Sequence, residues 1–277
     1  MTPLLLGLLL AAQPQPSSAR PGWPCVGRPD PSMVAVSEAS GGQIFLLDPS
    51  ELGAAAAMLT ARDGLEQVLR RVVGQVEPGM HTVEAHVDAS VDRVLFSASL
   101  QCLQAIEIVR PSGVPVAASD PDVTWQAFDA GRQVGVRDPA PGPWTVRLAG
   151  KGLLAVVVHA RAGVALERVQ LVRADGRAGH EGLVRDDAPL IAGTRRLIEV
   201  RLSPGLVDPE FEMRTSGDGP LGPVWPERDA RQDETATYRG EFTVPDQSFR
   251  VMVTGRDAAG SLVQRVQAGL FTVVQPR

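Results

Sequence analysis

The feature that most constrains this chain is an alternation of apolar and polar side chains that begins at Thr82 and recurs to the C-terminus. Successive side chains of a β-strand point to opposite faces, so a half-buried strand repeats with a period of two residues. We therefore predict a mainly β protein. Three clear sets of inward-facing residues are Val83, Ala85 and Val87; Val94, Phe96, Ala98 and Leu100; and Ile198, Val200 and Leu202.

Residues 79–162 combine closely spaced strands with short turns. Further strands are predicted at 105–110, 133–137, 144–148 and 153–160, the last being apolar throughout, as for a strand buried on both faces. Gly (28 residues) and Pro (23 residues) exceed their average shares of roughly 7% and 5%, which favours many turns over long helices. This stretch is predicted to be a β-sandwich.

Residues 163–277 repeat the pattern with turns at regular intervals. The turn at 216–220 and the strand at 249–257 are the plainest signals. A length of about 110 residues with this spacing fits an immunoglobulin-like or fibronectin-like sandwich. No repeat of 20–50 residues is apparent, so a solenoid is not expected.

Residues 33–78 are expected to form a strand-helix segment ahead of the two sandwiches, with an apolar strand at 44–47. Asp48 can cap a helix, Pro49 suits its first position, and Glu51 follows three residues after the cap. The helix is predicted to run toward residue 62 and to resume over 65–72, where apolar residues recur at helical spacing. Glycines and a proline within 74–79 are expected to end it.

The N-terminal sequence has the features of an export signal. An apolar run over residues 4–12 precedes the small residues 17–19, where a signal peptidase could cut. We expect residues 1–19 to be a signal peptide and residues 20–32 a Pro-rich linker, giving a secreted or periplasmic protein. No later run reaches the ~20 apolar residues of a membrane span, so no transmembrane segment is expected.

Two further features bear on partners and compartment. The formal net charge of −5, with Lys151 as the only lysine, offers no cationic cluster for nucleic acid. In an exported protein Cys25 and Cys102 are most simply one disulfide that ties the N-terminal segment to the first sandwich. The alternative is two separate thiols, with Cys102 buried in a strand.

Three segments in the same order resemble the region of hemicentins and related von Willebrand factor A-domain proteins that follows their A domain. Residues 39–45 with the helix after Asp48 resemble the end of an A domain. Residues 138–146 resemble the galactose-binding-like sandwich of those proteins, and residues 249–257 with 264–266 resemble their Ig-like module. The resemblance covers most of residues 33–270 and implies the tail of an A domain, followed by two sandwich modules, without the adhesion chemistry of the A domain itself.

The metal-binding part of an A domain is not expected here. That site uses an Asp-x-Ser-x-Ser loop after the first strand, and the resemblance begins beyond that strand. Residues 88–92 imitate such a loop superficially, but no helix follows them, so we interpret them as a polar hairpin turn.

No motif points to catalysis. The chain lacks Gly-x-Ser-x-Gly, a phosphate loop, HExxH and CxxC, so we expect a protein without catalytic residues, bound metal or cofactor. His159, at the end of an apolar strand, is interpreted as a satisfied or exposed single histidine. The adjacent carboxylates Asp186 and Asp187 are interpreted as a loop, with calcium as the alternative.

The tryptophans give the ligand candidates. Trp144 is in register with Val146 and Leu148 and is expected in the core. Sugar-binding sandwiches stack an aromatic ring on the sugar with carboxylates and Arg nearby. The candidate contacts are therefore Trp125 with Asp120 and Asp122, and Trp225 with Glu227 and Arg228.

These expectations lead to one principal function and two alternatives. The principal one is an exported, non-enzymatic β-sandwich protein for protein-protein interaction or surface adhesion. A carbohydrate-binding module that recognises a surface glycan is the second, and an enzyme of unknown class is the third.

Overall fold

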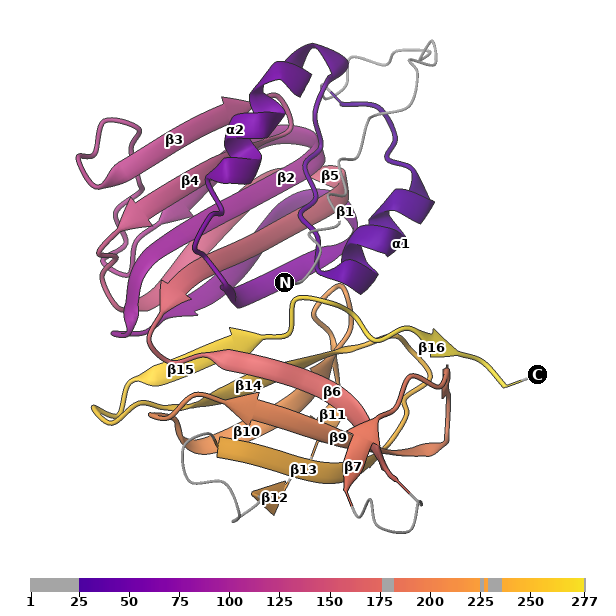
Figure 1. Ribbon diagram of the computed structural model, residues 1–277. Coiled ribbons are helices and arrows are strands. Elements are labelled where there is room, and N and C mark those ends of the chain that lie inside the picture. Colours follow the sequence, from indigo (N-terminus) through magenta and orange to yellow (C-terminus); the bar gives the residue numbers. More distant parts are fainter. Residues whose placement is uncertain (1–24, 176–181, 225–226, 229–235, 277) are drawn as a thin grey trace.

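The computed structural model describes residues 25–175, 182–224, 227–228 and 236–276, and Figure 1 shows them as two groups of strands joined by β5 and β6. The fold is mainly β, as predicted, with several antiparallel sheets. The helical elements are α1 (Pro31–Ser40), the 3-10 helix η1 (Pro49–Ala54) and α2 (Ala55–Thr60). The strands are β1 (Gln67–Val87), β2 (Val91–Val109), β3 (Val123–Phe128), β4 (Gly131–Arg137), β5 (Gly142–Ala162), β6 (Leu166–Ala174), β7 (Leu183–Arg185), β8 (Leu190–Ile191), β9 (Arg195–Leu202), β10 (Val207–Arg214), β11 (Pro220–Val224), β12 (Glu227–Arg228), β13 (Ala236–Thr243), β14 (Arg250–Arg256), β15 (Leu262–Val266) and β16 (Val273–Val274).

The first group is one sheet, ordered β1-β5-β2-β4-β3, that folds back on itself. Val87 of β1 pairs with Gly142 at one end of β5, whereas Val91 of β2 pairs with Ala162 at the other end. Only a three-residue turn separates Val87 from Val91, so the two ends of β5 must lie close together. In the middle of β5, Gly152 has φ +94°, a backbone conformation that glycine adopts without strain.

Folding the sheet brings its two halves face to face around a single core. Phe96, from the first half of β2, stacks on Trp144 of β5 with 5.3 Å between ring centroids. Trp144 is fully buried, as predicted, and its indole N–H donates to the Ala140 carbonyl oxygen at 2.9 Å. The strands predicted separately at 144–148 and 153–160 are therefore the two arms of one long strand, β5.

The helix predicted over residues 65–72 is wrong, because these residues lead into and form the start of β1. Both faces of β1 are buried here, with Leu69 in the folded-sheet core and Val68 against the C-terminal group. A register shift between Val68 and Arg70 also breaks the two-residue period. Together these effects imitate helical spacing, and β1 continues through residue 78, where the sequence placed a domain boundary.

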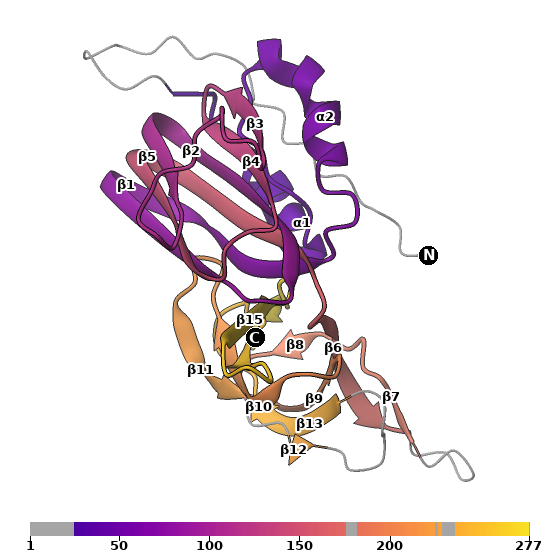
Figure 2. The ribbon, with the colours of Figure 1, turned by 90° about the vertical axis from the view of Figure 1, so that its left-hand side faces the viewer.

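The segment before β1 covers the outer face of the folded sheet (Figure 2). The helix start at Asp48 is confirmed, since Asp48 and Glu51 form a reciprocal capping box. The helix α1 was not predicted; it forms because the Asp30 side chain accepts from the Ser32 N–H and Pro31 suits the first turn. Residues 44–47, predicted as a strand, are buried but belong to none of the described strands.

The second group consists of two facing sheets, ordered β11-β10-β14-β15 and β12-β13-β9-β6-β7. Side chains from both sheets form one core, in which Phe211 of β10 contacts Tyr238 of β13 at 5.2 Å between ring centroids. A short parallel pair, β8 with β16, closes one end of this group.

Buried charges join the two groups. Glu38 of α1 accepts from Arg71 of β1 (Nε at 2.8 Å), from Arg250 of β14, and from the Ser216 hydroxyl at 2.5 Å. Arg265 of β15 binds Asp88 at 2.6 Å and the Val164 carbonyl oxygen at 2.8 Å. The charged ends of Arg71, Arg250 and Arg265 are thus compensated by partners distant in sequence, which fixes the two groups against each other.

The turn at 88–92 differs from the expected hairpin. It joins β1 and β2, but β5 lies between these strands, so they are not hydrogen-bonded neighbours. Asp88 is buried instead of solvated. Burial by itself raises its pKa, but Arg265 and Ser90 outweigh that effect and hold the pKa below the ordinary value of 3.8.

The disulfide between Cys25 and Cys102 is confirmed. It tethers the N-terminal segment to β2, and the Val26 N–H donates to the Gln101 carbonyl oxygen beside it at 3.0 Å.

Alkylation should show this bridge directly. Cys25 and Cys102 are the only cysteines of the chain. We therefore expect the protein to incorporate no alkylating agent when it is denatured without reductant, and two equivalents when it is denatured and reduced. Mass spectrometry of the intact chain measures both states, and two alkylated thiols without reductant would contradict the bridge.

Candidate functional site

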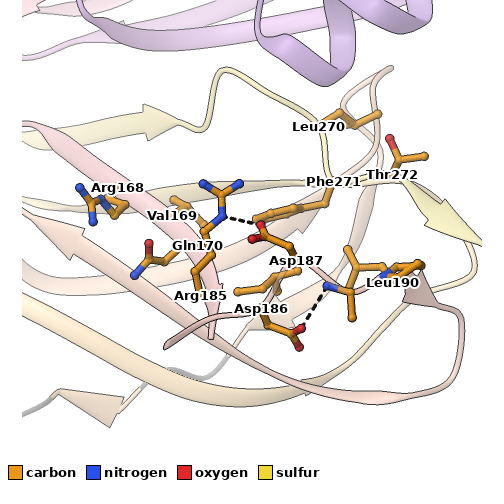
Figure 3. Close-up of a pocket in the computed structure, with 13 residues that line it drawn as sticks. Arg168, Val169, Gln170, Arg185, Asp186, Asp187, Leu190, Leu270, Phe271 and Thr272 are labelled. Atoms are coloured by element: carbon orange, nitrogen blue, oxygen red, sulfur yellow. Dashed lines mark hydrogen bonds and ion pairs between the residues drawn. The ribbon is translucent and has the colours of Figure 1, made fainter. Parts of the chain in front are cut away.

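A well-defined hollow lies in the second group, at the edge of β6. It has a volume of about 750 Å³ and is bounded by β6, by the loop from β7 to β8, and by the segment that precedes β16 (Figure 3). We call this hollow the β6-edge pocket. Its lining residues are Arg168, Val169, Gln170, Leu171, Arg185, Asp186, Asp187, Ala188, Pro189, Leu190, Leu270, Phe271 and Thr272.

A local turn creates the pocket by ending the pairing of β7 with β6. The ladder reaches Asp186, whose N–H donates to the Leu171 carbonyl oxygen at 2.9 Å. The Asp186 side chain then accepts from the Ala188 N–H at 3.1 Å, an Asx-type turn that diverts the chain. Pro189 follows and has no N–H to offer a ladder. Among the described residues, β6 therefore has no partner strand on this side in the part N-terminal to Leu171.

Val169 occupies the next ladder position along β6. In antiparallel pairing, successive residues direct their backbone groups alternately to the two sides of the strand. Because the Leu171 carbonyl faces away from β9, the N–H and C=O of Val169 face the same way, toward the pocket. No backbone hydrogen bond to Val169 on that side is made by the residues that the structure describes.

The floor of the pocket is apolar. Leu171 and Leu190 are buried in the core between the two sheets, and Val169 and Phe271 pack against that core. Phe271 also lies against Phe249, with 5.3 Å between ring centroids. A ligand side chain that enters beside Val169 would meet hydrocarbon.

The rim is charged. Arg185 binds Asp187 at 2.6 Å, and the largely buried carboxylate of Asp186 lies 3.9 Å from Arg196. Arg168 is exposed and stands directly opposite Arg201 of β9. Within the described part of the chain neither Arg168 nor Arg201 has an ion-pair partner, so the rim carries unneutralised positive charge at β6.

A smaller hollow of about 450 Å³ lies over β10 and β11 and is lined by Phe211, Val224 and neighbouring residues. It differs from the β6-edge pocket because β10 is paired on both sides, with β11 and with β14. It offers no free strand edge of β10.

The carboxylates predicted beside Trp125 are brought together by an arginine that the sequence analysis did not include. Arg110 binds Asp122 at 2.9 Å and Asp120 at 3.0 Å. The pKa of Asp120 is lowered by the Ala117 N–H and by Arg110, and that of Asp122 by Arg110. Trp125 is half-buried against the folded-sheet core. A ligand at this position would compete with Arg110 for both carboxylates.

The other predicted contacts fall outside what can be described. Trp225 lies outside the described residues, and so do the side chains of Glu227 and Arg228, whose backbone forms β12. Among the described residues no group of three or more His, Cys, Asp or Glu side chains is placed to hold a metal ion, and Asp186 and Asp187 are engaged as stated above. Within the same residues, none of the helices has the length and apolar character needed to cross a bilayer.

The pocket itself was not predicted, because its open edge depends on which strand pairs with β6. The available signal was the order of residues after 185: an Asp able to make an Asx turn, followed by a Pro three positions later.

No protein-family model matches the chain, and no curated protein matches it. Among solved structures, it is similar to a Bacillus licheniformis lipase, BlEst2, in its propeptide form, with 11% identity, a TM-score of 0.26, and coverage of 70% of this chain and 43% of that one. It is also similar to a Bifidobacterium dentium β-glucuronidase, with 8% identity, a TM-score of 0.25, and coverage of 70% and 39%. The chain spans less than half the length of either protein.

Proposed function

We propose that this chain is an exported, non-enzymatic β protein that recognises another protein at its β6-edge pocket. The observation that carries the proposal is the backbone of Val169, which faces the pocket without a partner among the described residues, beside an apolar floor. An open strand edge is a template for a further strand, so it is a ready contact site for another chain.

Two observations support binding over catalysis at this site. The described lining holds no His, Cys, Ser or Lys side chain, so its Thr272 hydroxyl has no histidine or lysine in the lining to act as its base. Its carboxylates are engaged with Arg185, Arg196 and a backbone N–H. The disulfide supports export, because such bridges persist in oxidising compartments.

In the same proposal the two groups of strands act as sandwich modules, galactose-binding-like and then Ig-like, in the manner of the hemicentin region that the sequence resembles. Recognition of a surface glycan stays the second candidate. It is favoured only by Trp125 near the Arg110 cluster, where the carboxylates already have a cation.

Site-specific photo-crosslinking tests the proposal. We expect a benzophenone amino acid at Thr272, an exposed pocket residue, to yield a discrete protein adduct in the exported fraction of the cells that make this protein. The same amino acid at Thr124, exposed on β3 of the first group, is the matched control. The adduct should decline when excess wild-type protein competes. An absent adduct, or the same adduct from both positions, would refute the proposal.

A further inference from the structure

We infer that the β6-edge pocket binds an extended peptide segment that adds a strand to β6, placing an apolar residue opposite Val169 and a carboxylate residue opposite Arg168. This inference rests on the proposed function and specifies the chemistry of the partner. Three properties of the pocket lead to it.

The first property is the vacant ladder position. The line of β7 ends where Asp186 turns the chain away from β6, and a guest strand would continue that line. One guest residue opposite Val169 can accept from its N–H and donate to its C=O, as the residues of a closely bonded antiparallel pair do. A register shift between Leu166 and Arg168 ends the regular edge, so the guest needs only a few residues.

The second property is the floor. Residues directly opposite each other on neighbouring strands have side chains on the same face of the sheet. Val169 faces the core between the two sheets, so the guest residue opposite it directs its side chain onto Leu190 and Phe271. An apolar guest side chain at this position loses contact with water without leaving a polar group unpaired.

The third property is charge. The next guest residue lies opposite Arg168 and, by the two-residue period, on the outer face of the sheet. Arg168 already faces Arg201 across the ladder, and like charges directly opposite are destabilising. A guest carboxylate beside Arg168 neutralises part of this charge, whereas a guest lysine adds to it. The favoured guest is therefore an extended segment in which apolar and acidic residues alternate.

The test uses the full chain and three synthetic hexapeptides with blocked ends. The first peptide alternates valine with aspartate, and the second alternates valine with lysine. The third is the first peptide with N-methyl groups on its valine nitrogens, which are the backbone nitrogens that face β6 in the proposed pairing. Amide NMR spectra of the isotope-labelled protein follow each titration. We expect the valine-aspartate peptide to shift the Val169 N–H signal and slow its exchange with solvent, with at least about tenfold weaker binding of the other two peptides.

Protein variants separate the charge from the strand edge. Arg168→Glu should invert the preference between the aspartate and lysine peptides, whereas Arg173→Glu, an exposed position on the part of β6 already paired with β7, should leave it unchanged. Val169→Pro removes the N–H that faces the pocket and should abolish binding of all peptides. If Val169→Pro fails to fold, the N-methylated peptide still tests the same hydrogen bonds.

Equal binding of the aspartate and lysine peptides, binding of the N-methylated peptide, or no binding of any peptide would each overturn the inference. If none of the peptides binds while the Thr272 crosslink persists, the pocket recognises a protein by other chemistry and only this inference fails. If both results are negative, the proposed function fails with it.

Discussion

Glu38→Gln is expected to lower the free energy of unfolding by about 3–5 kcal/mol, the range found when one partner of a buried ion pair is removed. The Glu38 carboxylate is almost fully buried and lies between Arg71 of β1 and Arg250 of β14. Glutamine keeps the volume but leaves two buried guanidinium groups without their counter-charge.

The two arginines differ in how much they depend on Glu38. Arg71 also donates to the Gly42 carbonyl oxygen at 2.8 Å, which keeps part of its hydrogen bonding in the variant. For Arg250, burial lowers the pKa to about 10 even though Glu38 favours its charged form. Losing Glu38 removes the largest favourable influence on that charge, so Arg250 should account for much of the destabilisation.

Urea unfolding monitored by tryptophan fluorescence and circular dichroism measures the effect. Glu107→Gln is the matched control, because Glu107 pairs with Arg147 at 3.1 Å on an exposed surface and should matter by no more than about 1 kcal/mol. A triple variant with methionine at positions 38, 71 and 250 should recover much of the loss, since it removes all three charges together. Equal effects of Glu38→Gln and Glu107→Gln would show that the buried triad does not hold the two groups together.

The sequence correctly predicted the features that depend on residues close together in the chain. The capping signal at Asp48, the burial of Trp144 and the Cys25–Cys102 bridge were all correct. Capping requires only neighbouring residues, and the bridge was the single possible pair. The mainly β class was predicted correctly because successive side chains of a strand point to opposite faces, so one buried face gives a period of two residues.

Errors arose where non-local contacts decide the structure. Leu69 and Val72 have helical spacing with Leu65, yet they belong to a strand whose two faces are covered by different parts of the chain. Glu38 is an unremarkable acid in the sequence, and its role depends on Arg250, which lies 212 residues away. The open edge at Val169 likewise requires knowing that β7 pairs with β6 on the side opposite β9 and that this pairing ends at Asp186.

His159 shows the same limit in chemical terms. From the sequence we expect a satisfied or exposed histidine at this position, and this expectation is wrong. The ring is fully buried on β5, and neither nitrogen has a hydrogen-bond partner among the described residues. Burial, with smaller contributions from the positive charges of Arg62 and Arg71, holds its pKa well below the ordinary value of 6.5.

This depressed pKa makes the protein less stable in mild acid. In the folded state His159 stays neutral, whereas in the unfolded chain it takes up a proton as the pH falls through 6.5. The unfolded state then binds more protons than the folded state. The contribution of His159 to stability is therefore complete above pH 6.5 and is lost as the pH falls below that value. Below pH 6.5, each further pH unit should cost up to about 1.4 kcal/mol of unfolding free energy for as long as the folded ring stays neutral.

His159→Leu is expected to remove that loss while keeping stability at pH 7.5, because leucine fills an apolar site without two unpaired ring nitrogens. Urea unfolding at intervals from pH 7.5 to 5.0 gives the slope for each protein. His86→Gln is the control, since His86 is partly exposed and lies 3.1 Å from Glu84. The wild-type protein and His86→Gln should share the steep slope, and His159→Leu should be flatter than both. A slope that is unchanged in His159→Leu would mean that the ring is not kept neutral by the fold.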